Sequence, residues 1–269
     1  MPVVIDSLDP EAIRRRLRTR TVDWDLRLYD EVTSTNDVLR ELARAGAPEG
    51  TVVLAETQTA AHGRLGKRWF SPPGVNLYAS VLFRPTIPPS AVGVFSFIAS
   101  LAVGDAIRGL GIEAAIKWPN DVLVDRKKVA GTLVECATAG DRVEHVILGV
   151  GVNLNVTRDA LAAGLGEESR AAGSLRGAAG REIDRNAFAA AFLGALEAWF
   201  RTYRDHGARP ILAGWLDRDI VGGRRVEVRG EARPWEGRVL GVDQQGYLVV
   251  RDPRGIRHRV VTGEIRLLD

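Results

Sequence analysis

The chain has 269 residues, 45% of them hydrophobic and 26% charged, which is enough for one large domain, or a main domain plus a small one, with a sizeable core. Its 37 Lys and Arg residues against 34 Asp and Glu leave a net charge of +3, too small an excess to indicate nucleic-acid binding by itself. The single cysteine, Cys136, excludes an internal disulfide framework and a cysteine-based zinc site.

The N-terminal stretch carries no targeting or membrane pattern. Residues 1–17 place acidic residues before basic ones and lack the apolar region of a signal peptide. No uninterrupted apolar run in the sequence approaches the roughly 20 residues of a membrane span. We therefore expect a soluble, cytoplasmic protein.

Two helix starts lie in the first 50 residues. Asp9-Pro10-Glu11 combines an N-cap residue, a proline at the first helical position and an acid in the first turn, which predicts a helix over 12–20. Ser34-Thr35-Asn36 offers a second cap before apolar residues at helical spacing, and Gly46 ends that helix.

Strands follow between the helices. Residues 51–57 are predicted to form a buried strand and residues 143–156 another strand. Residues 75–83 alternate as a strand does when one face meets a core. Residues 116–136 predict two strands joined by a charged turn at Asp125-Arg126-Lys127.

The remaining helices are expected between residues 90 and 218. Residues 90–111 are apolar nearly all round, which predicts a buried helix. Residues 157–181 are rich in Ala and Gly and predict a loop with a short helix. Asp184 is expected to cap a long helix through about Arg204. One more helix is expected at 210–218.

The sequence pattern changes at about residue 219, from long helical and strand segments to short strands. From there, short strands separated by Gly, Asp and Pro turns are typical of a small barrel. We therefore predict two domains, residues 1–218 and 219–269.

A basic loop at 58–76 is the first stretch that could carry chemistry. Gly63 and Gly66 allow a backbone to approach a ligand closely, and the cationic side chains could bind a phosphate or carboxylate. Its cationic and aromatic residues are His62, Arg64, Lys67, Arg68 and Trp69. The stretch matches neither a P-loop nor GxGxxG, so a solvated basic loop is the alternative.

Lys117-Trp118-Pro119-Asn120-Asp121 is the second candidate. Lys117 and Asp121 could place a cation and a carboxylate at one site, and one carboxylate suits Mg²⁺ that arrives on phosphates. A hairpin with a buried tryptophan and a surface ion pair is the alternative.

Three further stretches are weaker. Lys128 precedes an apolar strand and could be the counter-charge of an anion, or a solvated lysine. Asn153 follows strand glycines that permit close approach or simple strand packing. Residues 34–36 form a polar cluster that capping alone would explain. The four histidines show no metal-ligand spacing, and no GxSxG elbow occurs.

Together, and in this order, these stretches resemble the biotin protein ligase family. The family's Ser-Thr-Asn, AExQ, GRGRxGRxW, SPxGxNLY, KWPNDxxxxxxKxAG, GxGxN and GEIRL motifs fall on 34–36, 55–58, 61–69, 71–78, 117–131, 149–153 and 263–267. The resemblance covers roughly residues 28–269. It implies an α+β fold, with a mixed or antiparallel sheet packed with helices as in class II aminoacyl-tRNA synthetases, plus a small C-terminal SH3-like barrel.

The resemblance also implies an activity. Biotin and ATP with Mg²⁺ would give biotinyl-5′-AMP, and a lysine of a biotin carboxyl carrier protein, such as that of acetyl-CoA carboxylase, would then take the biotin. The implied biotin-binding residues are Ser34, Thr35, Asn36, Gln58, Gly63, Arg64 and Lys128. The implied ATP-binding residues are Arg64, Lys67, Trp69, Lys117 and Asn153. Lys128 and Arg64 would be catalytic, Asp121 would hold the metal, and the loop at 58–70 would order over the adenylate.

The chain departs from the family pattern in its basic loop. Ala61-His62 replaces the first Gly-Arg pair and Lys67 replaces the last arginine, so a direct role for His62 is not expected. Only about 25 residues precede the ligase core, too few for the helix-turn-helix domain of some members, so we expect the ligase-only form without DNA binding.

Two other functions stay open. Lipoate ligases share the catalytic fold, although KWPND and the small barrel favour biotin. A nucleic-acid-binding module would use the basic loop on phosphates and Trp69 on a base, but it predicts cationic residues spread along a face. The sequence does not decide between a monomer and a homodimer.

Overall fold

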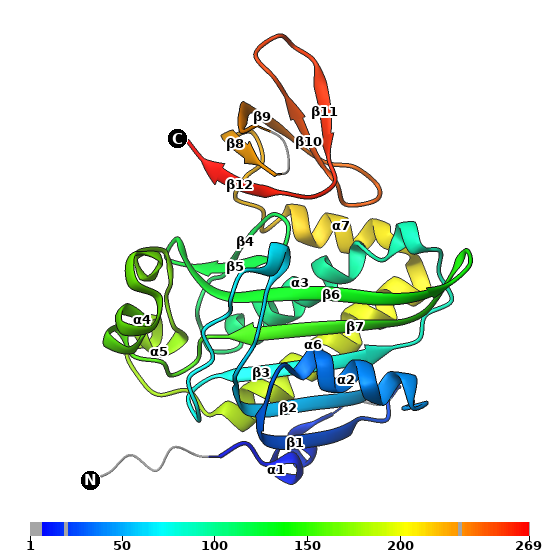
Figure 1. The fold of residues 1–269 in the computed structure, drawn as a ribbon, viewed down its shortest axis with the longest axis vertical. Helices are drawn as coiled ribbons and strands as arrows, with labels where there is room; N and C mark the ends of the chain where they lie inside the picture. Colours follow the sequence, from blue (N-terminus) through cyan, green and yellow to red (C-terminus); the bar gives the residue numbers. More distant parts are fainter. Residues whose placement is uncertain (1–6, 19–20, 231–232, 269) are drawn as a thin grey trace.

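A seven-stranded mixed sheet forms the main part of the molecule (Figure 1). The computed structural model describes residues 7–18, 21–230 and 233–268. The strands lie in the order β1 (Asp25–Val32), β2 (Thr51–Gln58), β3 (Leu77–Phe83), β7 (Arg142–Val152), β6 (Lys127–Ala139), β5 (Asp121–Val124) and β4 (Ala115–Lys117). Only the β1–β2 pair is parallel, and the other neighbours are antiparallel. The predicted mixed sheet with helices is confirmed.

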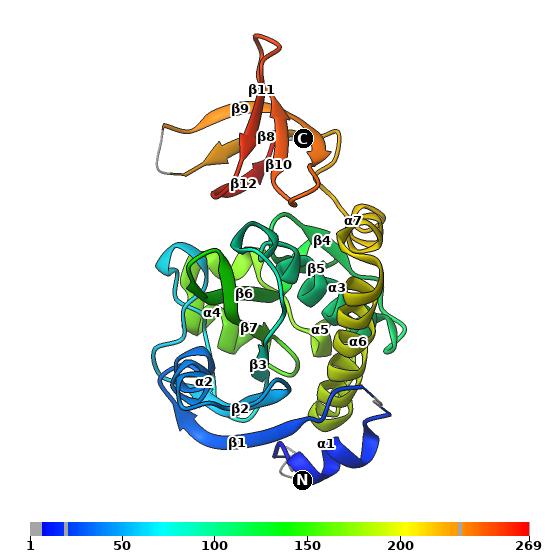
Figure 2. The same cartoon turned by 90° about the vertical axis from the view of Figure 1, so that its right-hand side faces the viewer.

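Helices cover both faces of this sheet. Figure 2 shows α2 (Thr35–Arg44) on one side and α3 (Val94–Arg108) with α6 (Arg185–His206) on the other. Phe83, Phe95 and Phe200 meet where the sheet, α3 and α6 pack together, with ring centroids 4.4 to 6.0 Å apart. Burying one such ring stabilises the fold by about 1.5–3 kcal/mol.

Helix α3 confirms the predicted buried helix. Within the described residues, Pro89–Arg108, which also includes the short 3₁₀ turn η2 (Pro89–Ala91), is the one stretch long and apolar enough to cross a membrane by length and composition. Its best window is 67% buried inside the molecule. A helix that is apolar all round belongs in a core, here between the sheet, α6 and α7 (Ala208–Leu216).

The predicted caps at Asp9 and Asp184 are confirmed. Asp9 accepts a hydrogen bond from the Glu11 amide at the start of α1 (Pro10–Arg16), and Asp184 accepts one from the Ala187 amide at the start of α6. The predicted extension of α1 is wrong for residues 17 and 18, which are extended or irregular, and residues 19–20 lie outside the described residues.

The region 115–139 holds three strands where two were predicted. Pro119 lacks an N–H and cannot continue a ladder, so β4 and β5 separate around Trp118-Pro119-Asn120. The predicted charged turn is present, with Asp125 and Arg126 both at positive φ. Residues 157–181 are more helical than expected, because α4 (Arg158–Leu165), η3 (Gly166–Ala171) and α5 (Leu175–Ala179) occupy most of them.

A second, five-stranded antiparallel sheet follows. Its order is β11 (Arg257–Val260), β10 (Leu248–Arg251), β9 (Trp235–Val242), β8 (Arg225–Arg229) and β12 (Glu264–Leu267). The chain enters it beside β4, where the Ile116 amide donates to the Arg218 carbonyl over 2.8 Å. Trp118 Nε1 also donates to the Gly246 carbonyl over 3.0 Å. The boundary between residues 218 and 219 stays a prediction.

Candidate active site

A cavity of about 450 Å³ opens between strands β5, β6 and β7 of the large sheet, the loop after β2 and the C-terminal sheet. This volume is ordinary for a small-molecule site. All twelve residues that the sequence analysis assigned to ligands line it: Ser34, Thr35, Asn36, Gln58, Gly63, Arg64, Lys67, Trp69, Lys117, Asp121, Lys128 and Asn153. The fold therefore brings six of the seven sequence motifs to one place, the exception being residues 71–78, and the individual roles stay predictions.

Hydroxyl and amide groups form one wall. Gln58 Oε1 accepts hydrogen bonds from the Thr35 amide at 2.9 Å and from Thr35 Oγ1 at 3.2 Å. Gln58 Nε2 donates to Ser71 Oγ at 3.1 Å. Ser34 occupies the N-cap position of α2 but makes no side-chain capping bond, so capping does not account for its hydroxyl. This wall suits a neutral polar ligand group that both donates and accepts hydrogen bonds.

Asn36 is held from two sides. Its Oδ1 accepts from Ser80 Oγ at 2.6 Å, and its Nδ2 donates to Glu135 Oε2 at 2.8 Å. Glu135 in turn accepts from Arg40 Nη2 at 2.8 Å. Gly149 on β7 leaves the space that this amide fills, because a Cβ there would lie 2.2 Å from Asn36 Oδ1. The amide orientation is therefore fixed before any ligand arrives.

Cationic groups gather at the opposite wall. Lys128 Nζ lies 2.6 Å from Asp121 Oδ1 across the β5–β6 pair. Burial lowers the pKa of Lys117, with Asp121 acting in the opposite direction and Lys128 adding to the lowering. Lys117 and Lys128 beside the single carboxylate of Asp121 leave an excess of positive charge here, which attracts a ligand that carries several negative charges.

The loop after β2 folds back toward the C-terminal sheet. It forms a short 3₁₀ turn, η1 (Arg64–Gly66), and the Gly63 amide donates to the Lys67 carbonyl over 2.6 Å. Arg64 donates to Thr262 Oγ1 at 3.2 Å and the Gly263 carbonyl at 3.4 Å, and it lies 5.7 Å from the centre of the Trp118 ring.

Two electrostatic effects accompany this contact between the basic loop and the C-terminal sheet. Burial lowers the pKa of the Arg64 guanidinium, against the attraction of Asp121 and Glu264. Lys67 Nζ pairs with Glu264 Oε1 at 2.5 Å, and both side chains are well exposed. The C-terminal sheet therefore contacts the basic loop through at least two of the loop's cationic side chains.

Trp69 lies flat against glycines of the sheet. A Cβ at Gly151 would come within 2.5 Å of its indole, and one at Gly131 within 3.2 Å. Its Nε1 is buried without a hydrogen-bond partner in the described structure, and its ring lies 5.4 Å from Lys128 Nζ. Asn153 Nδ2 donates to the Gly173 carbonyl at 3.0 Å. The indole gives the cavity an aromatic surface beside a positive charge.

Several contributors were missed by sequence reasoning. Ser80, Glu135 and Arg40 orient Asn36, and Leu161 with Leu165 from α4 adds an apolar lip. No local pattern marks these residues, because strand pairing and helix packing bring them in. The C-terminal motif was noticed, and the structure shows that Gly263, Glu264 and Ile265 line the cavity itself.

Comparisons with known proteins agree with this geometry. Residues 28–153 match the model of the Biotin/lipoate A/B protein ligase family, and residues 221–268 match the biotin protein ligase C terminal domain. A biotin--[acetyl-CoA-carboxylase] ligase of Paracoccus denitrificans is 35% identical over 82% of this chain and 92% of its own length. The chain belongs to the biotin protein ligase family. The bifunctional ligase/repressor BirA of Bacillus subtilis is 34% identical over 97% of this chain and 79% of its own length.

Solved biotin protein ligases also share the fold. A biotin protein ligase from Aquifex aeolicus, solved in complex with biotin and ATP, superposes with a TM-score of 0.74 at 26% identity. The match covers 90% of this chain and 98% of that one. The expected fold class, including an antiparallel C-terminal sheet, is therefore confirmed along with the family.

Proposed function

We propose that this chain is an ATP-dependent ligase that activates biotin as biotinyl-5′-AMP and transfers it to a lysine of a biotin carboxyl carrier protein. The observation that carries the proposal is the two-sided cavity, with neutral hydrogen-bonding groups on one wall and Lys117, Lys128 and Arg64 on the other, in a chain of this family. Biotin has a matching polarity, with a neutral ureido ring at one end and a carboxylate at the other.

The first step needs charge neutralisation. A biotin carboxylate oxygen attacks the α-phosphorus of ATP, and the bond to the β-phosphate oxygen breaks to release pyrophosphate. Both reactants are anionic, so fixed cations at the reacting atoms lower the barrier. We assign this work to Lys128 and Arg64, with Lys67 and Lys117 on the outer phosphates. Ser34, Thr35, Asn36, Gln58 and Gly63 are assigned to biotin.

The second step forms the amide. The acceptor amine attacks the acyl carbon of the adenylate, AMP leaves with the bonding electrons, and the amine loses a proton. Water must be kept from the anhydride meanwhile, and the loop held by Arg64 against the C-terminal sheet suits a cover. Trp69 and Asn153 are assigned to the adenine side.

The residues present fit magnesium that arrives with ATP. Among the described residues no cluster of three acidic, His or Cys side chains could form a protein cage, whereas Asp121 supplies one carboxylate at the cationic wall. Mg²⁺ commonly uses one or two carboxylates plus substrate phosphates. When bound, it would neutralise phosphate charge, and Asp121 would hold it. Because the reaction consumes ATP, we place it in the cytoplasm.

Biotin is favoured over lipoate by the C-terminal domain match at 221–268. A nucleic-acid module is disfavoured because Arg64 and Lys67 contact the C-terminal sheet at the cavity and do not extend along an open face.

Biotin-dependent exchange of pyrophosphate into ATP tests the proposal. The wild-type chain should catalyse exchange and should label an acceptor domain with biotin but not with lipoate. Lys128→Ala should lower exchange by about 100-fold or more. Arg64→Gly should still form adenylate but release it into solution. Lys127→Ala, which removes an exposed lysine at the first position of β6, is the matched control. Exchange that does not require biotin would refute the proposal.

A further inference from the structure

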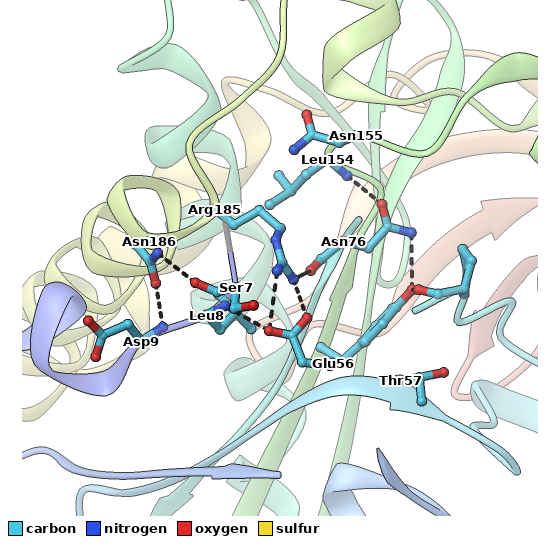
Figure 3. Close-up of polar contacts among 12 residues, drawn as sticks. Ser7, Leu8, Asp9, Glu56, Thr57, Asn76, Leu154, Asn155, Arg185 and Asn186 are labelled. Atoms are coloured by element: carbon cyan, nitrogen blue, oxygen red, sulfur yellow. Dashed lines mark hydrogen bonds and ion pairs between the residues drawn. The ribbon is translucent and has the colours of Figure 1, made fainter. Parts of the chain in front are cut away.

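A largely buried ion pair lies outside the candidate cavity and lines no part of it. Arg185, in the first turn of α6, has only 2% of its side chain exposed, and Glu56, near the end of β2, has 16% exposed. Arg185 Nη1 lies 2.7 Å from Glu56 Oε2 and Nη2 lies 3.2 Å from Oε1, so the guanidinium grips both carboxylate oxygens (Figure 3). Glu56 belongs to the AExQ motif that supports the family resemblance, but sequence reasoning assigned a role to neither residue.

Stability alone is a poor reason for this pair. Moving two charges out of water is costly, and apolar residues of similar volume often replace such a pair without loss of stability. A two-pronged Arg–carboxylate contact does, however, fix the relative position and direction of the segments it joins. The pair therefore matters mainly for the segments that its two side chains hold together.

The pair joins both ends of the basic loop. Glu56 is two residues before Gln58, and its backbone carbonyl accepts from the Gly74 amide at 3.1 Å. Arg185 Nη1 also donates to the Asn76 carbonyl at 3.3 Å. The chain segments before and after the loop at 59–70 are thereby tied to one guanidinium–carboxylate unit.

The connection continues to the cavity wall on each side. Thr57 Oγ1 donates to the Ser71 carbonyl at 2.8 Å, next to the contact between Gln58 and Ser71 Oγ. Asn76 Oδ1 accepts from the Leu154 amide at 2.9 Å, directly after Asn153 in the chain (Figure 3). A shift of the ion pair would therefore displace Gln58.

The N-terminal segment closes over the same carboxylate. The Leu8 amide donates to Glu56 Oε1 at 2.7 Å. Asn186 accepts from the Asp9 amide at 2.8 Å and donates to the Ser7 carbonyl at 3.1 Å (Figure 3). Glu56 thus receives hydrogen bonds from two directions, which fixes its rotamer.

We propose that Glu56 and Arg185 are positioning residues for biotin, which they never touch. They hold Gln58 and the ends of the basic loop in the arrangement that binds biotin. The inference rests on the proposed function. The buried ion pair outside the cavity is thereby expected to affect the affinity for biotin more than the rate of the chemical step.

The test compares stability with biotin binding. Arg185→Met should weaken biotin binding, measured by calorimetry without ATP, by about 10-fold, because a displaced Gln58 would lose a hydrogen bond to the ligand and one such bond is worth about that factor. The KM for biotin in pyrophosphate exchange should rise in parallel, while kcat at saturating biotin stays near the wild-type value. Arg185→Lys, which keeps the charge but loses the fork, should be intermediate.

The double variant Glu56→Leu/Arg185→Met separates positioning from stability. Its thermal midpoint should recover relative to Arg185→Met, because no buried charge is left unpaired, while its biotin affinity stays weak. Arg218→Met is the matched control, since Arg218 pairs with Asp105 at 2.8 Å with 11% of its side chain exposed. That control should lower the midpoint and leave the biotin KM unchanged.

Specific outcomes would overturn the inference. A folded Arg185→Lys variant with wild-type biotin affinity would do so, and that variant decides the matter if Arg185→Met does not fold. Recovery of both stability and affinity in the double variant would also do so. Failure of the wild-type chain to bind biotin refutes the proposed function instead, so the two failures are distinguishable.

Discussion

Lys128 Nζ lies 2.6 Å from Asp121 Oδ1, so the residue assigned to the biotin carboxylate contacts the one assigned to the metal. The strand register explains the contact, because β5 and β6 pair here with an irregularity between Val122 and Leu123. The lysine therefore carries a compensated charge before substrates bind. With the roles proposed above, ligand binding at the two positions would be coupled through this pair.

Asp121→Asn should separate the two roles. Removing the carboxylate weakens the hold on Mg²⁺, so the Mg²⁺ concentration for half-maximal exchange should rise about 10-fold. Biotin binding without ATP should be unchanged or tighter, because Lys128 is released from its partner. Asp125→Asn, at the exposed turn after β5, is the control. An unchanged Mg²⁺ requirement would remove Asp121 from the metal site.

Gly151→Ala should damage the nucleotide side. The new methyl would lie 2.5 Å from the Trp69 indole and displace it, at a cost of about 1–3 kcal/mol in strain. We expect a raised KM for ATP in exchange assays and a smaller change for biotin. Gly194→Ala, on α6 with open space around the new methyl, should leave both KM values unchanged and slightly raise the thermal midpoint. A normal ATP KM in Gly151→Ala contradicts the assignment of Trp69.

The pH dependence of ATP use should reflect Lys117. Burial lowers the pKa of this lysine, so as the pH rises it loses its charge sooner than an ordinary lysine, which titrates at about pH 10.4. The value of kcat/KM for ATP should therefore begin to fall at a lower pH than it would if an exposed lysine bound the phosphates. Lys117→Arg stays protonated, so its profile should extend to higher pH. Identical alkaline limbs in the two proteins would exclude Lys117 from phosphate binding.

Trypsin should report closure of the basic loop. Arg64, Lys67 and Arg68 offer cleavage sites, and biotin with ATP should slow their cleavage several-fold as the loop orders over the adenylate. Arg254, in the exposed turn between β10 and β11, provides an internal control whose cleavage rate should not change. Equal protection of 58–70 with and without substrates would show that the loop does not respond to them.

The features of the fold that depend on residues close together in the sequence, such as the helix caps, were predicted correctly. Asp9 and Asp184 were identified as caps because a side-chain acceptor before an apolar repeat satisfies helix amides, and both make that bond. The strand count around Pro119 was wrong, since a proline inside an apolar stretch leaves the strand boundaries undetermined. The helices in 157–181 were underestimated because Ala and Gly give no clear periodicity.

The residues that line the candidate site were predictable from the sequence, whereas the distant residues that hold them in place were not. Resemblance to a family placed twelve residues that the structure gathers in one cavity. It could not supply the partners that hold them. Glu135 reaches Asn36 from 99 positions away, and Arg185 reaches Glu56 from 129 positions away. Contacts at such separations depend on sheet order and helix packing, which no short pattern in the sequence records.

The contact between Arg64 and the Gly263 carbonyl spans 199 positions, and it has a consequence for synthesis. Domains generally fold as units in the order in which they leave the ribosome. The seven-stranded sheet and its helices can therefore assemble while the cavity still lacks Gly263, Glu264 and Ile265. A nascent chain would pass through a stage in which most substrate contacts exist but the basic loop has nothing to close against. With the function proposed above, completion of the second sheet would be the moment at which the protein becomes able to retain a reactive intermediate.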